Sequence, residues 1–271
     1  MDNTGKAIYD VVVLIPHYNN LDGLIKSLGS IYYEESIMIL VVDDGSILTE
    51  RPVLQQLTKV TDYPVVLRFL QKNEGIEAAL NLGISEILKT QNAKYIARLD
   101  CGDIMVRDRL KLQVSYLNEN KNIYLLGSWV DFIQQGKRLF SLKLPKDHST
   151  IRKQMMYKVC FIHPAVTFRV SGIDKVGYYP TDYPAAEDYA FFYRFVESFE
   201  TANLQKVLTI VESNLEGISL SHRRLQLRSR LKVLLDNPKI SILWIVGVIK
   251  IKLLQIVPNS IIISIKQLIY R

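Results

Sequence analysis

The chain has 271 residues, of which 48% are hydrophobic and 23% are charged. This length and composition suit one large domain, alone or with an appendage, and exclude an intrinsically disordered protein. The formal charge of +7 favours an anionic partner, and nucleotide diphosphates, anionic lipids and nucleic acids all fit it. The two cysteines, Cys101 and Cys160, exclude a disulfide framework and a Cys-x-x-Cys metal site.

The sequences of the two ends of the chain predict where in the cell the protein is located. Residues 1–6 do not have the pattern of a signal peptide. Residues 240–249 are almost all apolar, but Lys250 and Lys252 end this run well short of the ~20 residues that a spanning helix needs. We therefore expect a cytoplasmic protein whose C-terminal end lies on the inner face of the cell membrane.

Strand and helix patterns alternate over the first hundred residues. Short runs of β-branched and other apolar residues indicate strands that are buried on both faces. In chain order, we expect a strand at 9–15, a helix at 21–33, a strand at 37–42, a helix at 53–60, a strand at 65–70, a helix at 75–88 and a strand at 95–99. This alternation indicates right-handed βαβ units in an open, mostly parallel sheet with helices on both sides.

The second half of the chain has a less regular pattern. Asp108 is placed to cap a helix that runs to about residue 118. After it we expect a strand at 123–134, a turn at 135–137, a strand at 139–144, a helix at 146–158, a strand at 165–170, a loop at 171–184 and a helix at 187–199. From about Gly217, arginine and lysine alternate with leucine. We therefore predict an α/β domain over 1–216 and a helical, amphipathic extension over 217–271.

Three acidic pairs stand at the ends of these elements. They are Asp43-Asp44 after the second strand, Asp100 with Asp103 after the fourth, and Glu187-Asp188 at the start of a helix. Because ligands bind at the carboxyl ends of strands in open α/β sheets, we expect the pairs to meet at one sugar-nucleotide site. The alternative for each pair taken alone is an ordinary turn or helix cap.

Each pair suits a different chemical task. The first can accept hydrogen bonds from a base or ribose hydroxyl. The second can hold a divalent cation that neutralises a diphosphate. The third can supply a general base that deprotonates an acceptor hydroxyl.

These pairs belong to a series of short motifs that covers roughly residues 8–200. The motifs are VLIPHYN at 13–19, VVDDGS at 41–46, NEGI to ALNLGI at 73–84, ARLDCGD at 97–103, HPAVTFR at 163–169 and AEDY at 186–189. In order and spacing they resemble family 2 glycosyltransferases with the GT-A fold, of the bacterial polysaccharide-assembly type. The resemblance implies this Rossmann-like fold for the α/β domain.

The resemblance also implies which residues bind the donor. Pro16 and Tyr18 would line the nucleotide pocket, and Asp44, together with Asp43, would hold the base or ribose. Arg98 is a further candidate, as a positive charge that neutralises the diphosphate of the donor.

The metal and the catalytic base follow from the same resemblance. Asp100 and Asp103 would hold Mn²⁺ or Mg²⁺, and Asp188 would be the base of an inverting, single-displacement transfer. The family's turn usually reads Asp-x-Asp-Asp, and Gly102 stands where the middle carboxylate is expected. The metal is then held by Asp100 and Asp103 with water and phosphate, or is bound more weakly, or is dispensable.

Smaller signals receive simpler interpretations. His17 and His163 are expected to pack or to form hydrogen bonds, and Cys101 is expected to be a small filler because no general base is placed beside it. Residues 222–224 either close over the leaving diphosphate or form a solvated helix face. Residues 244–254 and 261–271 have apolar faces with a basic edge, which is typical of membrane interfaces; the alternative is two helices packed on protein.

The resemblance implies an inverting glycosyltransferase that uses a nucleotide-sugar donor, with UDP as the usual nucleotide of the family. Its acceptor would be a hydroxyl of a growing, lipid-linked bacterial glycan, reached at a membrane surface. No nucleic acid is expected, because the basic segment lacks aromatic interleaving, and the oligomeric state is left open. The alternative is a catalytically silent binding protein with the same fold. The missing carboxylate at Gly102 is consistent with this alternative, whereas the Glu187-Asp188 pair, which a binding protein does not need, argues against it.

Overall fold

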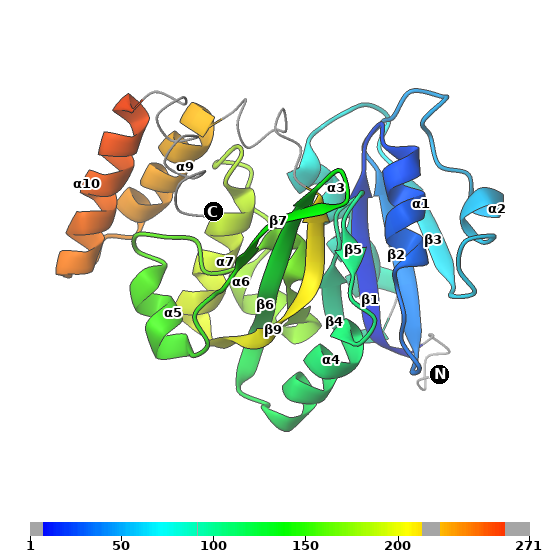
Figure 1. The fold of residues 1–271 in the computed structure, drawn as a ribbon, viewed down its shortest axis with the longest axis horizontal. Helices are drawn as coiled ribbons and strands as arrows, with labels where there is room; N and C mark the ends of the chain where they lie inside the picture. The colour runs from blue at the N-terminus through cyan, green and yellow to red at the C-terminus, as the bar shows by residue number, and fades with distance from the viewer. Residues whose placement is uncertain (1–7, 91, 213–222, 258–271) are drawn as a thin grey trace.

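The computed structural model describes residues 8–90, 92–212 and 223–257, and in this part of the chain nine strands form one sheet (Figure 1). The strands are β1 (Ile8–His17), β2 (Ile37–Asp43), β3 (Val65–Phe69), β4 (Asn92–Arg98), β5 (Ile104–Met105), β6 (Ile123–Gln134), β7 (Lys137–Leu142), β8 (Thr167–Arg169) and β9 (Glu200–Glu212). The order along the sheet is β3-β2-β1-β4-β8-β6-β9-β5, and β7 pairs with β6.

Helices lie on both sides of this sheet (Figure 1). They are α1 (Leu21–Gly29), α2 (Leu54–Leu57), α3 (Ile76–Thr90), α4 (Arg109–Glu119), α5 (His148–Gln154), α6 (Ile173–Val176), α7 (Glu187–Ser198), α9 (Arg223–Asp236) and α10 (Ile242–Ile256), with 3-10 turns η1 (His163–Ala165) and η2 (Val170–Gly172). Because side chains alternate along a strand, Val11 and Val13 of β1 pack with α1 and α4, whereas Val12 and Leu14 pack with α3 and α7.

The first half of the sheet is parallel, as predicted. β1 pairs in parallel with β2 and β4, and β2 pairs in parallel with β3. The register places His17 opposite Asp43 and Leu14 opposite Arg98. The carboxyl ends of β1, β2 and β4 therefore meet at one edge, where the acidic turns begin.

The second half of the sheet is mixed and contains an element that the sequence analysis missed. β8 is antiparallel to β4 and β6, whereas β9 is parallel to β6 and antiparallel to β5. Residues 200–212 were not assigned to a strand. Buried polar residues, Thr201, Asn203 and Thr209, interrupt the apolar pattern of β9 and explain the omission.

Several predicted boundaries also need correction. The segment 171–184, predicted to be a loop, contains η2 and α6, and the helices expected at 53–60 and 146–158 shorten to α2 and α5. Asp108 occupies the N-cap position of α4, but among the described residues its side chain forms no capping hydrogen bond.

The C-terminal helices pack on the α/β core through one face. Leu227, Leu234 and Ile251 are buried in the same cluster as α3 and α7. At Gly247 a Cβ atom would overlap the carbonyl oxygen of Met156, so α10 lies directly against that backbone. The packing alternative is therefore correct for this face.

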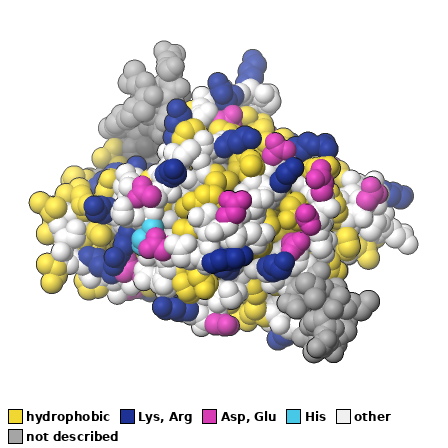
Figure 2. All heavy atoms as spheres, turned by 90° about the horizontal axis from the view of Figure 1, so that it is seen from below, with side chains coloured by type: hydrophobic (Ala, Val, Ile, Leu, Met, Phe, Trp, Pro, Cys, Tyr) yellow, Lys and Arg dark blue, Asp and Glu magenta, His cyan; other side chains and the backbone are white. Residues whose placement is uncertain are grey.

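The opposite face of α10 is apolar and exposed. Its residues recur at helical spacing: Ile242, Ile245, Val246, Ile249, Leu253 and Ile256. Figure 2 shows hydrophobic side chains gathered at the end of the molecule where Figure 1 places α10. Within the described ranges, no helix is both long and apolar enough to cross a membrane. His222, residues 261–271 and the predicted domain boundary at 216–217 lie outside the described residues.

Candidate active site

The end of β1 and the turn after β2 form one hydrogen-bonded unit. Asp43 is fully buried, and its carboxylate accepts hydrogen bonds from Nδ1 of His17 at 2.8 Å and from the backbone N–H of Ser46 at 3.1 Å. Pro16 precedes His17, and Tyr18 is exposed beside it. His17 therefore has the hydrogen-bonding role that the sequence predicted. The ring of Tyr18 is exposed to solvent, whereas the carboxylate of Asp43 is enclosed by the protein.

Asp44 is held by the segment that precedes α3. The backbone N–H groups of Glu74 and Gly75 donate to its two carboxylate oxygens at 2.7 and 3.0 Å. Burial raises the pKa of Asp44, and these two hydrogen bonds oppose the shift. Gly45 has φ +68°, and a Cβ there would collide with the backbone of Lys72. The turn is therefore fixed by contacts within the protein before any ligand binds.

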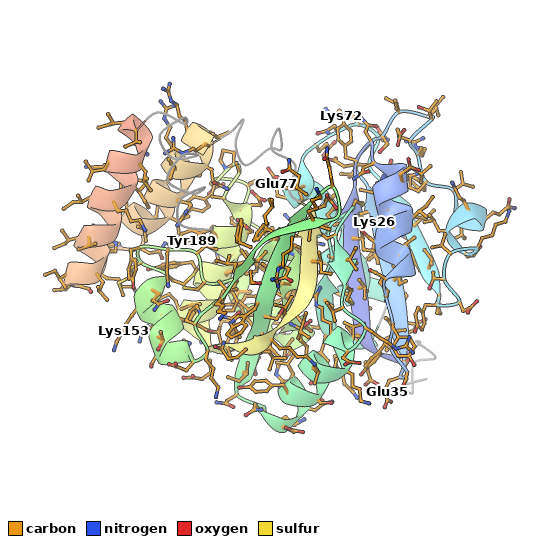
Figure 3. All side chains as sticks on the ribbon, viewed as in Figure 1. Lys26, Glu35, Lys72, Glu77, Lys153 and Tyr189 are labelled. Carbon is orange, nitrogen blue, oxygen red and sulfur yellow. The ribbon has the colours of Figure 1, made fainter. Side chains whose placement is uncertain are left out.

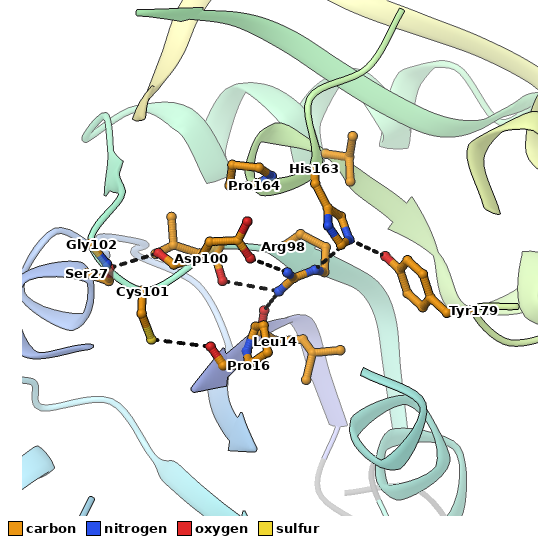
Figure 4. A network of polar contacts seen from close by, with 12 residues as sticks. Leu14, Pro16, Ser27, Arg98, Asp100, Cys101, Gly102, His163, Pro164 and Tyr179 are labelled. Carbon is orange, nitrogen blue, oxygen red and sulfur yellow. Dashed lines mark hydrogen bonds and ion pairs between the residues drawn. The ribbon is translucent and has the colours of Figure 1, made fainter. Parts of the chain in front are cut away.

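Arg98, at the end of β4, lies beneath the next acidic turn (Figure 4). Its guanidinium is fully buried and donates to the carbonyl oxygens of Leu14 and Leu99 and to the carboxylate of Asp100. A buried guanidinium does not reach a diphosphate at the surface. The geometry favours an anchor for Asp100 over the predicted direct contact with the donor.

His163 and Tyr179 complete this network from the other half of the sheet. Nε of Arg98 donates to Nε2 of His163 at 3.2 Å, and the hydroxyl of Tyr179 donates to the same nitrogen at 2.9 Å (Figure 4). Burial, with the positive charge of Arg98, lowers the pKa of His163 to about 3. His163 is therefore a neutral hydrogen-bond acceptor, in agreement with the sequence analysis.

The rest of the acidic turn is held by Ser27 of α1. Its hydroxyl donates to the carbonyl oxygens of Asp100 and Asp103, and it accepts from the N–H of Gly102 at 2.9 Å. Cys101 has a thiol directed at the carbonyl oxygen of Pro16, and burial raises its pKa, so it fits the predicted filler. A serine in the middle of a helix carries no sequence signal for this task, and the sequence analysis missed it.

The described side chains of this turn do not form a cation site by themselves. Asp103 is buried and accepts from the N–H of Glu212 at 3.0 Å, while Asp100 pairs with Arg98. Gly102 has φ +97° and offers no carboxylate between them. In the described part of the chain, no group of three His, Cys, Asp or Glu side chains is placed to hold a metal ion. The donors present, with the partners that they have, do not fit a divalent cation held by protein ligands.

The third acidic pair opens α7. Asp188 is partly exposed and accepts from the N–H of Tyr189 at 2.6 Å. Burial raises the pKa of Asp188, and the positive charge of Arg230 in α9 lowers it. The guanidinium of Arg230 also lies over the ring of Tyr189, 4.9 Å from its centroid. The C-terminal extension thus places a cation next to the predicted base.

Electrostatic coupling links this pair to the strand ends. The negative charge of Asp100 raises the pKa of both Glu187 and Asp188. Asp43 and Asp100 together raise the pKa of Cys101. We refer to Asp43, Asp44, Asp100 and Asp103 as the strand-end carboxylates, and to Glu187 and Asp188 as the helix carboxyls. The strand-end carboxylates follow β2 and β4 at the edge of the sheet where β1 also ends, and the helix carboxyls lie within electrostatic range of Asp100.

Comparison with known proteins identifies similar sequences. The model of glycosyl transferase family 2 matches residues 12–177. A UDP-Gal:alpha-D-GlcNAc-diphosphoundecaprenol beta-1,3-galactosyltransferase of Escherichia coli is 30% identical over 193 residues, which cover 68% of this chain and 66% of that protein. The amylovoran biosynthesis glycosyltransferase AmsE of Erwinia amylovora is 29% identical over 219 residues, covering 76% and 77% of the two chains.

Other matches cover less of the relative or show the fold alone. An uncharacterised glycosyltransferase of Rickettsia felis is 32% identical over 135 residues, which are 49% of this chain but 21% of that protein. The mannosyltransferase PcManGT of Pyrobaculum calidifontis, solved with GDP-Man and Mn²⁺, has a TM-score of 0.65 at 15% identity, covering 91% of this chain and 69% of that one. Residues 1–349 of S. aureus TarS, solved with UDP, have a TM-score of 0.59 at 17% identity, covering 86% and 67%.

Proposed function

Because the chain belongs to glycosyl transferase family 2, we propose that it is an inverting transferase that moves a sugar from a nucleotide diphosphate to a hydroxyl of a lipid-linked glycan. The observation that supports the proposal is the position of the strand-end carboxylates where parallel strands end, with Asp100 within electrostatic range of the helix carboxyls. A fixed binding edge beside a partly desolvated carboxylate is what a base-assisted displacement requires.

The proposed reaction is a single displacement. The carboxylate of Asp188 takes the proton of the acceptor hydroxyl while that oxygen attacks the anomeric carbon of the donor sugar. The bond between the anomeric carbon and the diphosphate oxygen breaks, and the nucleoside diphosphate leaves with the electron pair. Attack from the face opposite the leaving group inverts the anomeric configuration.

On the donor side, we propose that Pro16 and Tyr18 line the nucleotide pocket, with Asp43 and Asp44 beside the base or ribose. Arg98 holds one oxygen of Asp100, and the partly exposed carboxylate of Asp100 is proposed to lie beside the diphosphate of the donor. The E. coli relative is named for a UDP-sugar donor and a diphosphoundecaprenol-linked acceptor, and this favours UDP and a lipid-linked acceptor here. Since the donor set does not fit a metal ion, no step of this proposal involves one.

A membrane surface is the proposed place of the reaction. The exposed apolar face of α10 has Lys250 and Lys252 beside it, and Arg224 and Arg228 are exposed on α9. An apolar face with basic neighbours suits the interface of an anionic bilayer. This would place the protein on the cytoplasmic leaflet, where it would meet a lipid-linked acceptor.

The proposal is tested with purified protein, a panel of UDP-, dTDP- and GDP-sugars and a synthetic GlcNAc-diphosphoundecaprenol acceptor. We expect one donor to give a disaccharide product whose anomeric configuration, read by NMR, is opposite to that of the donor. The Asp188→Asn variant should lose at least about a thousandfold in kcat, since it removes the general base. Full activity of this variant would reject Asp188 as the base, and nucleotide binding without transfer to any acceptor would favour a silent binding protein.

A further inference from the structure

Glu187 is a buried carboxyl that the proposed reaction does not use. It is the first residue of α7, and its side chain is 7% exposed. Its Oε2 atom is shielded from solvent and has no hydrogen-bond partner among the described residues. An ionised carboxylate in such a place would lose hydration, and the hydrogen bond from the backbone N–H of Glu187 itself offsets only part of this loss, because the pKa is raised overall.

The groups around Glu187 are mostly negative. Asp188 follows it in α7, and the negative charges of Asp188, of Glu77 in the first turn of α3 and of Asp100 after β4 all raise the pKa of Glu187. In Figure 3 the labelled Glu77 stands at the start of α3, at the top of the sheet. Two described cations of the site act on other carboxyls: Arg98 pairs with Asp100, and the positive charge of Arg230 lowers the pKa of Asp188. A helix N-terminus favours an anion, but three neighbouring carboxyls oppose a fourth charge.

We propose that Glu187 and Asp188 share a single proton at neutral pH, that Glu187 holds it, and that Asp188 is thereby kept as the ionised base. The inference rests on the proposed function for the role of Asp188, whereas the protonation of Glu187 stands on its own surroundings. Arg230 fixes the direction of the sharing, because its positive charge favours the ionised form of Asp188.

Glu187 is then a positioning residue that acts through Asp188. An ionised Glu187 would repel the charge on Asp188 and favour its protonated form, which cannot accept a proton from an acceptor. It would also add a negative charge beside the donor's diphosphate. Burial and Asp188 raise the pKa of Glu187 to about 8, so the pair keeps its proton through the neutral range.

The protonation is tested directly by ¹³C NMR of the full chain labelled at the glutamate side-chain carboxyl carbons. We expect one signal that titrates near pH 8 and disappears in the Glu187→Gln variant. Glu119→Gln, a change at an exposed glutamate of α4, is the matched control and should leave that signal in place. A Glu187 signal that titrates at the usual glutamate pH overturns the inference.

A kinetic test separates this inference from the assignment of the base. Glutamine is neutral and nearly isosteric with a protonated glutamate, so Glu187→Gln should retain kcat at pH 7 within about threefold. Above about pH 8 the pair loses its shared proton and gains a second negative charge beside the diphosphate of the donor. Wild-type kcat/KM should therefore fall there, whereas the variant should not show this fall. Loss of activity in Glu187→Gln comparable to that in Asp188→Asn would overturn the sharing of one proton. An active Asp188→Asn variant with the NMR signal intact would instead reject the proposed base alone.

Discussion

The strand-end carboxylates and the helix carboxyls are both acidic, but their surroundings differ. On the strand-end side, each carboxylate has a donor from the protein: His17 for Asp43, two backbone N–H groups for Asp44, Arg98 for Asp100 and the N–H of Glu212 for Asp103. On the helix side, an oxygen of Glu187 is buried without a partner among the described residues, and Asp188 bonds the N–H next to it.

From this difference we assign donor binding to the strand-end carboxylates and proton transfer to the helix carboxyls. Carboxylates that are held by hydrogen bonds or an ion pair from the protein are fixed in position and contribute to stability, so they can present fixed acceptors to a ligand. Desolvated carboxyls that lack hydrogen-bond donors are able to exchange protons. Burial also raises the pKa of Asp44 and Asp103 on the strand-end side, but there backbone N–H groups from other segments oppose the rise. Substitutions on the strand-end side should therefore reduce stability and nucleotide binding. On the helix side, substitution of Asp188 should abolish transfer, whereas Glu187→Gln should change only the pH dependence.

The largest effect on stability is expected at Arg98. Replacing it by methionine leaves the buried carbonyl oxygens of Leu14 and Leu99 without their donor and Asp100 without its cation. We expect a loss of about 3–5 kcal/mol in the free energy of unfolding, measured by urea denaturation. Arg138→Met, at an exposed arginine of β7, is the control and should change stability little. Equal stability of both variants would contradict the anchoring role of Arg98.

A slightly smaller loss is expected at Asp44. The Asp44→Ala variant leaves the N–H groups of Glu74 and Gly75 without their acceptor. Because Glu74 is exposed and Gly75 half-buried, water replaces part of the loss, and we expect a cost of about 1–3 kcal/mol in total. Urea denaturation should show this loss, and calorimetry at low temperature should show weaker UDP binding. Unchanged stability would mean that the turn is held by other contacts.

On the helix side, Glu187 should affect how the free energy of unfolding depends on pH. The pKa of Glu187 rises from 4.5 in the unfolded chain to about 8 in the folded one, so between these values the folded state binds the extra proton. This contribution therefore makes stability fall as pH rises, with a slope of at most about 1.4 kcal/mol per pH unit. Thermal unfolding of the Glu187→Gln variant should lack this slope between pH 5 and 8, while Glu119→Gln should keep it. An identical pH profile for both would count against the raised pKa.

The exposed face of α10 offers a further contrast, because it lies outside both carboxyl sets. Leu253→Glu should weaken co-sedimentation with phosphatidylglycerol vesicles about tenfold, since burial of one leucine contributes about 1.5–3 kcal/mol. Leu139→Glu, at an exposed leucine of β7, is the control. Equal binding by both variants, or no preference over phosphatidylcholine vesicles, would reject this surface.

The smallest effect is expected from chelation. Asp100 and Asp103 already have partners in the protein and Gly102 adds no ligand, so EDTA should change UDP affinity by less than about threefold. Calorimetry with and without Mn²⁺ measures this. A loss of binding on chelation would show that Asp100 and Asp103 rearrange to hold a cation.

The sequence predicted the elements in which a single local pattern, such as a run of β-branched residues, is clear. The β-branched runs of β1 and β2 and the acidic turns after them predicted the parallel half of the sheet and the edge at which β1, β2 and β4 end. β9 was missed because threonine and asparagine are buried in it through contacts made by distant segments, such as the hydrogen bonds from Asn203 to the carbonyl oxygens of Pro145 and Cys160. Ser27 and Arg230 have no local signal, since their partners lie 73 or more residues away or on another helix.

The most direct test compares UDP binding by the wild type, Asp188→Asn and Asp44→Asn in one calorimetric series. If binding and chemistry belong to separate sides, Asp188→Asn should bind UDP as the wild type does while it fails to transfer the sugar. Asp44→Asn should bind at least about tenfold more weakly, a difference of about 1.4 kcal/mol. Loss of UDP binding in Asp188→Asn, or unchanged binding in Asp44→Asn, would contradict the division of labour between the strand-end carboxylates and the helix carboxyls.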